Sequence, residues 1–130
     1  MKSEKLQLHD YILNSDNEIR EVIRVSTNKR VEIMDLKTHL HCEVNEDELN
    51  SILLTGKILQ NNGFYYIYDD WGDHSWYNDA KDIVLEENPI GRFYIKVMQN
   101  FVDIDYVHNF QQYLRMLGHN EFANNLKIIK

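Results

Sequence analysis

The chain has 130 residues, 43% of them hydrophobic and 27% charged, as expected for one globular domain spanning residues 1–130. Its formal net charge of −7 argues against non-specific binding of nucleic acid, which depends on neutralising phosphates with Lys and Arg. Cys42 is the only cysteine, so no internal disulfide can form, and no segment approaches the roughly 20 apolar residues that span a bilayer.

The first third of the sequence predicts a β-meander over residues 10–36. Ile19–Val25 and Val31–Met34 are rich in β-branched residues, which favour strands, and polar turn-forming residues separate them. Leu40 and Val44 extend this region towards a short edge strand. We therefore expect consecutive antiparallel strands at the start of the chain.

A short helix is predicted over residues 45–55. Asn45 can accept a hydrogen bond from an N–H group of the first turn, and Glu48 stands where a capping-box acid reaches back. Gly56 is placed to end this helix. Its buried side would consist of Leu49, Ile52 and Leu53.

Further strands are predicted after this helix. Lys57–Gln60 and Phe64–Tyr68 form a hairpin if Asn62-Gly63 adopts the primed turn that this dipeptide favours. Ile83–Leu85 and Arg92–Met98 are two more runs of strand-forming residues. These runs would complete the sheet begun by the meander.

Residues 69–82 are predicted to form a polar, acidic loop that contains Trp71, Trp76 and Tyr77. Large aromatic side chains in such a loop either fold back over the sheet or contact a partner. The acidic residues lack the alternating ligands, central glycine and terminal Glu of a helix–loop–helix calcium site. We therefore expect a solvated loop whose aromatic residues are a candidate binding surface.

The C-terminal run 104–117 predicts an amphipathic helix. Apolar residues recur at the spacing of one helix face, which is Tyr106, Phe110, Tyr113, Leu114 and Leu117. This face is expected to be buried on the sheet. The predicted fold is therefore α+β, with a curved, mainly antiparallel and half-open barrel-like sheet, one short middle helix and this C-terminal helix.

The same helix has a second, wholly polar stripe. It consists of His108, Gln111, Gln112 and Arg115, which also recur at helical spacing. Amide and guanidinium groups make directional contacts, so this polar stripe is a candidate binding face. Two alternatives stay open: the stripe is the solvated side of a surface helix, or His108 turns inward and bonds a neighbouring strand.

No metal, cofactor or catalytic site is predicted. On one strand His39 and His41 would share a face while Cys42 points the other way as a buried thiol, so the three do not converge on a metal. The sequence has no Gly-x-Ser-x-Gly elbow, phosphate-binding glycine loop or His-Glu-x-x-His helix. We therefore expect a protein that is not an enzyme.

Three parts of the chain carry a resemblance to other proteins: Leu8–Ile12, Val44–Leu49, and the run Tyr106-Val-His-Asn-Phe-Gln111 with Leu114, Leu117 and residues 122–128. The chain resembles a large group of small uncharacterised proteins encoded by bacteriophages, prophages and mobile elements of Bacteroidetes, whose last helix begins Val-His-x-apolar-Gln. Gly118-His119 stands where the group has a Thr-Gly-like turn, and residues 69–82 match nothing in it. The resemblance implies a phage context and a fold, and it brings no catalytic residue.

These features predict a non-enzymatic phage or mobile-element accessory protein that acts by binding a host or phage protein, for example by inhibiting a host defence protein. One alternative is a small-ligand protein that captures a nucleotide signal, with Arg92, Arg115, Trp71 and Tyr77 as candidate pocket walls. Another is a structural, virion-associated homo-oligomer. No signal peptide and no membrane partner are predicted, so we expect the protein in the host-cell cytoplasm or with the virion.

Overall fold

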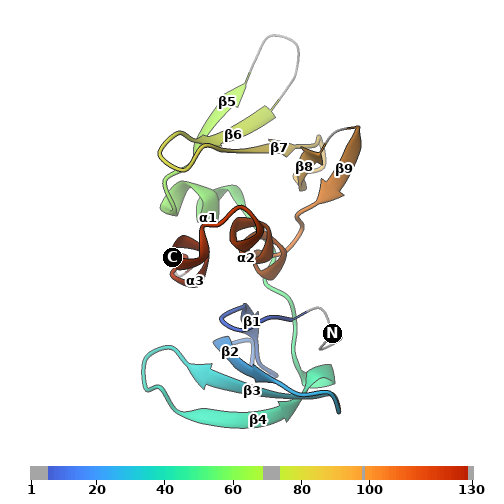
Figure 1. Ribbon diagram of the computed structural model, residues 1–130, viewed down its shortest axis with the longest axis vertical. Helices are drawn as coiled ribbons and strands as arrows, with labels where there is room; N and C mark the ends of the chain where they lie inside the picture. The colour runs from blue at the N-terminus through green and yellow to red at the C-terminus, as the bar shows by residue number, and fades with distance from the viewer. Residues whose placement is uncertain (1–5, 69–73, 98, 129–130) are drawn as a thin grey trace.

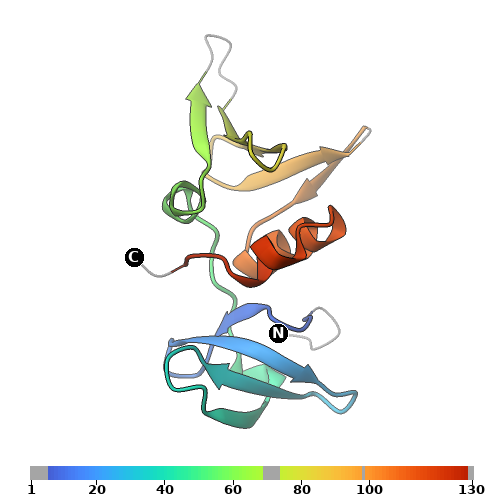
Figure 2. The same ribbon diagram turned by 60° about the vertical axis from the view of Figure 1, so that its left-hand side comes forward.

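The computed structural model describes residues 6–68, 74–97 and 99–128. Its architecture is α+β, as predicted, but the strands form two antiparallel sheets, and neither sheet closes into a barrel. Figures 1 and 2 show the two sheets at opposite ends of an elongated molecule, with the helices between them. Within the described residues no helix is long and apolar enough to cross a membrane.

The first sheet confirms the predicted meander and has the strand order β1-β2-β3-β4. Its strands are β1 (Tyr11–Leu13), β2 (Ile19–Val25), β3 (Arg30–Asp35) and β4 (His41–Asn45). Paired residues such as Val22 and Ile33 face the same side of the sheet. That side forms a small hydrophobic core made of Leu6, Ile12, Val22, Val31, Ile33 and Leu49.

The helix predicted over residues 45–55 is wrong beyond its first turn. The Asn45 side chain does accept a hydrogen bond from a first-turn N–H at 2.9 Å, but the single-turn 3-10 helix η2 (Glu46–Glu48) then ends. The next residues are extended because their backbone groups bond to a distant strand. Asn50 exchanges two backbone hydrogen bonds with Leu13, at 2.9 and 3.0 Å.

The middle helix lies later, in α1 (Gly56–Asn61), where the sequence predicts a strand. The Thr55 side chain begins it by accepting a hydrogen bond from a first-turn N–H at 3.2 Å. Gly63 ends it with a φ of 87°, and the Phe64 N–H donates to the Leu59 carbonyl at 3.0 Å in a Schellman arrangement. The predicted hairpin is therefore wrong, because the positive φ that suits a primed turn also suits this helix end.

The second sheet has the strand order β5-β6-β7-β8-β9. Its strands are β5 (Tyr65–Tyr68), β6 (His74–Asn78), β7 (Ile83–Glu87), β8 (Phe93–Val97) and β9 (Asn100–Asp103). The loop predicted over residues 69–82 is therefore wrong for residues 74–78, which pair with strands on both sides. Strand β9 is absent from the sequence-based prediction.

Helices α2 (Val107–Met116) and α3 (Asn120–Asn124) lie between the two sheets, as Figure 1 shows. Helix α2 confirms the predicted C-terminal helix. Phe110 and Leu114 are 0% exposed, and the Phe110 ring meets the Phe64 ring edge-on at 5.7 Å. Leu117, predicted to be buried, is the C-cap residue of α2 and is 43% exposed.

Candidate functional site

Gln111 of the polar stripe lies inside the protein and joins the last long helix to the first strand. Its side chain is 0% exposed, and its Oε1 accepts a hydrogen bond from the Tyr11 N–H at 2.8 Å. Its Nε2 donates to the His9 carbonyl at 2.9 Å and to the Ala123 carbonyl at 3.0 Å. One side-chain amide therefore satisfies three backbone groups and ties α2 to the chain segments beside it.

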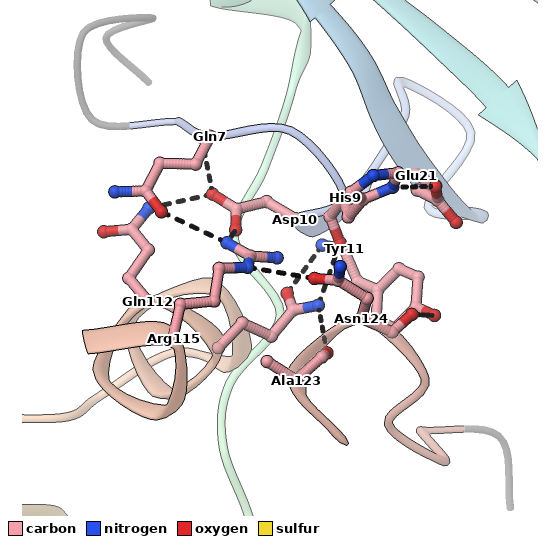
Figure 3. Close-up of polar contacts among 10 residues, drawn as sticks. Gln7, His9, Asp10, Tyr11, Glu21, Gln112, Arg115, Ala123 and Asn124 are labelled. Atoms are coloured by element: carbon pink, nitrogen blue, oxygen red, sulfur yellow. Dashed lines mark hydrogen bonds and ion pairs between the residues drawn. The ribbon is translucent and has the colours of Figure 1, made fainter. Parts of the chain in front are cut away.

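Arg115 and Gln112 bind the buried carboxylate of Asp10 (Figure 3). Arg115 Nη1 lies 2.5 Å from Asp10 Oδ1, and Gln112 Nε2 donates to Asp10 Oδ2 at 2.8 Å. The Asp10 side chain is 0% exposed and the Arg115 side chain 14% exposed. The Gln7 N–H also donates to the carboxylate at 2.8 Å, and Arg115 Nε donates to Asn124 Oδ1 at 3.0 Å. The buried negative charge is therefore matched by an internal cation and further donors.

The same region contains Tyr11 and His108. The Tyr11 hydroxyl donates to the Asn124 carbonyl at 2.7 Å. Burial raises the pKa of Tyr11, Glu21 raises it further, and Arg115 opposes the rise. His108 is 4% exposed, and its ring lies parallel to the Tyr106 ring, with the ring centres 5.9 Å apart.

The side chains of the polar stripe pack within the protein and make internal contacts. His108 and Gln111 are buried, while Gln112 and Arg115 bond the Asp10 carboxylate. We call this connection the α2–β1 joint, which consists of Asp10, Tyr11, Gln111, Gln112 and Arg115. The joint gives these side chains a role in the fold.

Two of the three predicted loop aromatics lie in strand β6. A Cβ atom on Gly56 would come within 2.9 Å of the Trp76 ring, so the indole lies directly on the start of α1. Trp76 Nε1 also donates to Glu87 Oε1 at 2.8 Å. Trp76 therefore covers the sheet, whereas Tyr77 faces the opposite side and stacks on Tyr65 at 5.8 Å. Trp71 lies outside the described residues.

The residues predicted to line a nucleotide pocket contact different neighbours in the structure. Arg92 lies 3.9 Å from Asp105, Arg115 is held in the α2–β1 joint, and Tyr77 stacks on Tyr65. The fourth candidate is Trp71, which is not among the described residues. The structure therefore does not assemble the described candidates into one pocket.

The residues around Cys42 differ from the prediction as well. Cys42 is exposed rather than buried, and His39 has a φ of 61° in the turn before β4 rather than lying on the strand. His41 Nδ1 lies 3.3 Å from Glu32 Oε1. Across residues 6–68, 74–97 and 99–128, no three His, Cys, Asp or Glu side chains gather as a metal site would require.

The second sheet has one face towards the helices and an outer face away from them (Figures 1 and 2). Exposed and half-buried aromatic side chains lie on the outer face. Strand register places on this face Tyr65, Ile67, Tyr77, Val84, Tyr94 and Phe101, which together we call the aromatic face. Phe101 is 66% exposed and Tyr65 44%, and the Tyr94 and Phe101 rings meet edge-on at 5.4 Å. Apolar residues scattered singly over a surface are ordinary, whereas several on one sheet face make that face a candidate interaction site.

Acidic side chains lie among the residues of the aromatic face. The Tyr65 hydroxyl donates to Asp79 Oδ2 at 2.8 Å, and this hydrogen bond raises the pKa of Tyr65. Ser75 Oγ donates to Glu86 Oε2 at 2.7 Å on the same face. The Lys96 ammonium lies 5.9 Å from the centre of the Phe101 ring. The face thus combines aromatic rings with carboxylates and the Lys96 ammonium.

A hollow of about 890 Å³ lies between α2 and the β8–β9 hairpin. Its apolar walls are Ile95, Val102, Ile104, Tyr113 and Met116. Asn100, Asn109 and Asn120 add amide groups to its lining. Small-molecule sites typically have volumes of about 300–1,000 Å³ with apolar walls and a few polar groups, so this hollow has the size and composition of such a site.

Comparisons with protein-family models, with curated proteins and with solved structures find no match to this chain. Sequence reasoning missed the aromatic face because Tyr77 was assigned to a loop and Phe101 to no element. The signal that could have found it is the alternation of Tyr65 and Ile67 with Tyr66 and Tyr68 in a strand that the sequence does predict.

Proposed function

We propose that the protein is a non-enzymatic accessory protein of a bacteriophage or mobile element that acts by binding another protein through the aromatic face. The observation that carries this proposal is the group of exposed aromatic and aliphatic side chains on one sheet face. Aromatic residues are enriched in the centres of protein interfaces, where they dominate binding energy. The phage context is supported by the resemblance of the run Tyr106–Gln111.

The charge of the protein favours a basic partner. The net charge is −7, and Asp79, Glu86 and Asp103 lie on or beside the aromatic face. An acidic surface speeds association with a basic one and fits a groove that otherwise holds nucleic acid. Inhibition of a nucleic-acid-binding host defence protein is therefore the form of action that we propose.

A matched pair of lysine variants tests this proposal. Ile67 on the aromatic face is 42% exposed and Leu40 on the first sheet's last turn is 72% exposed, so Ile67→Lys and Leu40→Lys make the same change at two surface positions. Tagged wild-type and variant proteins would be used to capture partners from host lysate, with quantitative mass spectrometry of the retained proteins. We expect the wild-type and Leu40→Lys proteins to retain the same partner and Ile67→Lys to lose it. Equal retention by all three would contradict the proposal.

A second candidate function is the binding of a small nucleotide in the hollow between α2 and β9, and its volume of about 890 Å³ is the observation in favour. A ligand that binds only the native state raises the apparent stability of the protein. A thermal-shift screen with cyclic and linear nucleotides at millimolar concentration therefore tests this candidate. No shift with any nucleotide would rule against it and leave protein binding as the function.

A further inference from the structure

Strand β5 is an edge strand of 4 residues, and it lacks the charged residues and proline that commonly protect an edge from pairing with another strand. Its residues, Tyr-Tyr-Ile-Tyr, include no charge and no proline, and their exposure ranges from 41% to 62%. The other edges differ, because β4 carries Glu43, β9 carries Asp103 and β1 has only 3 residues. Natural proteins protect sheet edges in these ways because an unpaired edge is a template for a further strand. Among the strands of the described ranges only β6 pairs with β5.

Both sides of β5 offer aromatic rings to a strand that would lie beside it. Tyr65 and Ile67 belong to the aromatic face, and Tyr66 and Tyr68 point to the opposite side. On that opposite side the Tyr68 ring meets the His74 ring edge-on at 5.0 Å, and the Tyr66 hydroxyl is hydrogen-bonded to His74 Nδ1. These contacts hold the rings in position before any partner arrives, which lowers the entropy lost on binding.

The charges recorded at the side chains of β5 are acidic. Asp79 accepts a hydrogen bond from the Tyr65 hydroxyl at 2.8 Å, and burial raises the pKa of Tyr66, which the negative charge of Glu87 raises further. The Lys81 ammonium lies 5.2 Å from the centre of the Phe122 ring, on the helix side. Aromatic ring faces beside carboxylates attract Arg and Lys side chains through cation–π and ionic contacts together.

We propose that an extended segment of the partner protein, with Arg or Lys at alternate positions, adds to β5 as a further strand of the second sheet. Its backbone pairs with the outer edge of β5, and its alternate side chains lie over Tyr65 and Ile67 on one side and over Tyr66 and Tyr68 on the other. This inference rests on the proposed function and names its mode of binding. A second copy of this chain fits less well, because pairing β5 with itself would bring two acidic surroundings together.

A peptide selection on the intact protein tests the proposal while the partner is unidentified. The probe is a displayed library of randomised short linear peptides. We expect enriched peptides that alternate Arg or Lys with β-branched or aromatic residues, and we expect them to slow hydrogen exchange at backbone amides within residues 65–68. Methylation of alternate peptide nitrogens on the paired edge should weaken binding by at least about tenfold, because it removes the backbone donors. This control changes only the peptide, so it cannot unfold the protein.

Several outcomes would overturn strand addition: no enriched peptide, binding that leaves exchange at residues 65–68 unchanged, or full binding by the methylated peptide. Protection of these amides in the protein alone, with a dimer in light scattering, would assign the edge to a second copy instead. Phe101→Ser separates the two proposals, because Phe101 lies on β9 at the far edge of the sheet. Loss of the lysate partner by Phe101→Ser without any protection of β5 would retain the aromatic face as the site and reject strand addition.

Discussion

The side-chain oxygen of Gln111 accepts a hydrogen bond from the backbone N–H of Tyr11 at 2.8 Å, between residues 100 positions apart in the sequence. The same amide donates to the carbonyls of His9 and Ala123, so it lies where the first strand, α2 and α3 meet. Because none of this side chain is exposed, water does not compete for these hydrogen bonds. Gln111 is thus a structural link between the first sheet and the helices.

Replacing Gln111 by Ala should lower the free energy of unfolding substantially. Three backbone groups would lose this partner, and each buried polar group left unsatisfied costs about 1–3 kcal/mol, so we expect a total loss of at least about 3 kcal/mol. Gln60→Ala, at an exposed position of α1, is the matched control and should change stability by about 0.5 kcal/mol or less. Urea unfolding measures both, and equal effects of the two substitutions would contradict the buried link.

The apolar stripe of α2 makes a second prediction. Phe110 is 0% exposed, and Phe110→Ala should lower the free energy of unfolding by about 3–5 kcal/mol, the usual cost for a buried Phe. Leu117 is 43% exposed, and we expect Leu117→Ala to cost less than about 1 kcal/mol. A loss below about 1 kcal/mol for Phe110→Ala would mean that the helix is docked differently.

The buried Tyr11 hydroxyl predicts a pH dependence. Burial raises the pKa of Tyr11 above 10.0, so its contribution to stability is fully present below pH 10.0 and is lost as the pH rises towards the folded-state pKa. Tyr11→Phe removes both this titration and the hydrogen bond to the Asn124 carbonyl, which should cost about 1 kcal/mol near neutral pH. The difference between wild type and variant, measured by urea unfolding, should shrink above pH 10.0. A constant difference up to pH 11 (roughly one unit above an ordinary Tyr pKa) would show that the hydroxyl does not titrate as proposed.

Local sequence patterns predicted the parts of the fold that depend on local chemistry. The meander follows from β-branched runs such as Ile19–Val25, and α2 follows from the spacing of Phe110 and Leu114. The failure over residues 45–55 has a long-range cause. Asn50 bonds to Leu13, and this contact between distant segments overrides the helix signal of Asn45.

The role of the polar stripe was harder to predict than the fold, because the polarity of a side chain does not reveal which residue it contacts. Gln112 and Arg115 have the spacing of a solvated helix face, yet the buried Asp10 carboxylate lies opposite them. Nothing in the sequence pairs Asp10 with Arg115, which lies 105 positions later. Sequence reasoning kept an alternative in which His108 turns inward, and in the structure His108 is 4% exposed.

The exposed ion pair between Arg30 and Glu43 is a control for the buried pair between Arg115 and Asp10. Arg30 Nε lies 2.8 Å from Glu43 Oε1, but the two side chains are 41% and 60% exposed. Removing it with Arg30→Ala should cost less than about 1 kcal/mol, because water screens surface pairs. The Arg115–Asp10 pair differs in burial, with side-chain exposures of 14% and 0%.

We propose that the polar stripe is structural and that the aromatic face binds the partner. The stability of the Gln112→Ala/Arg115→Ala double variant tests this most directly. The free energy of unfolding, measured in urea, should fall by about 3 kcal/mol or more, because the Asp10 carboxylate stays buried without its cation. Under conditions where the double variant is folded, it should still capture the partner that Ile67→Lys loses. A double variant that is as stable as the wild type and no longer captures the partner would contradict the account, since the polar stripe would then be the contact surface.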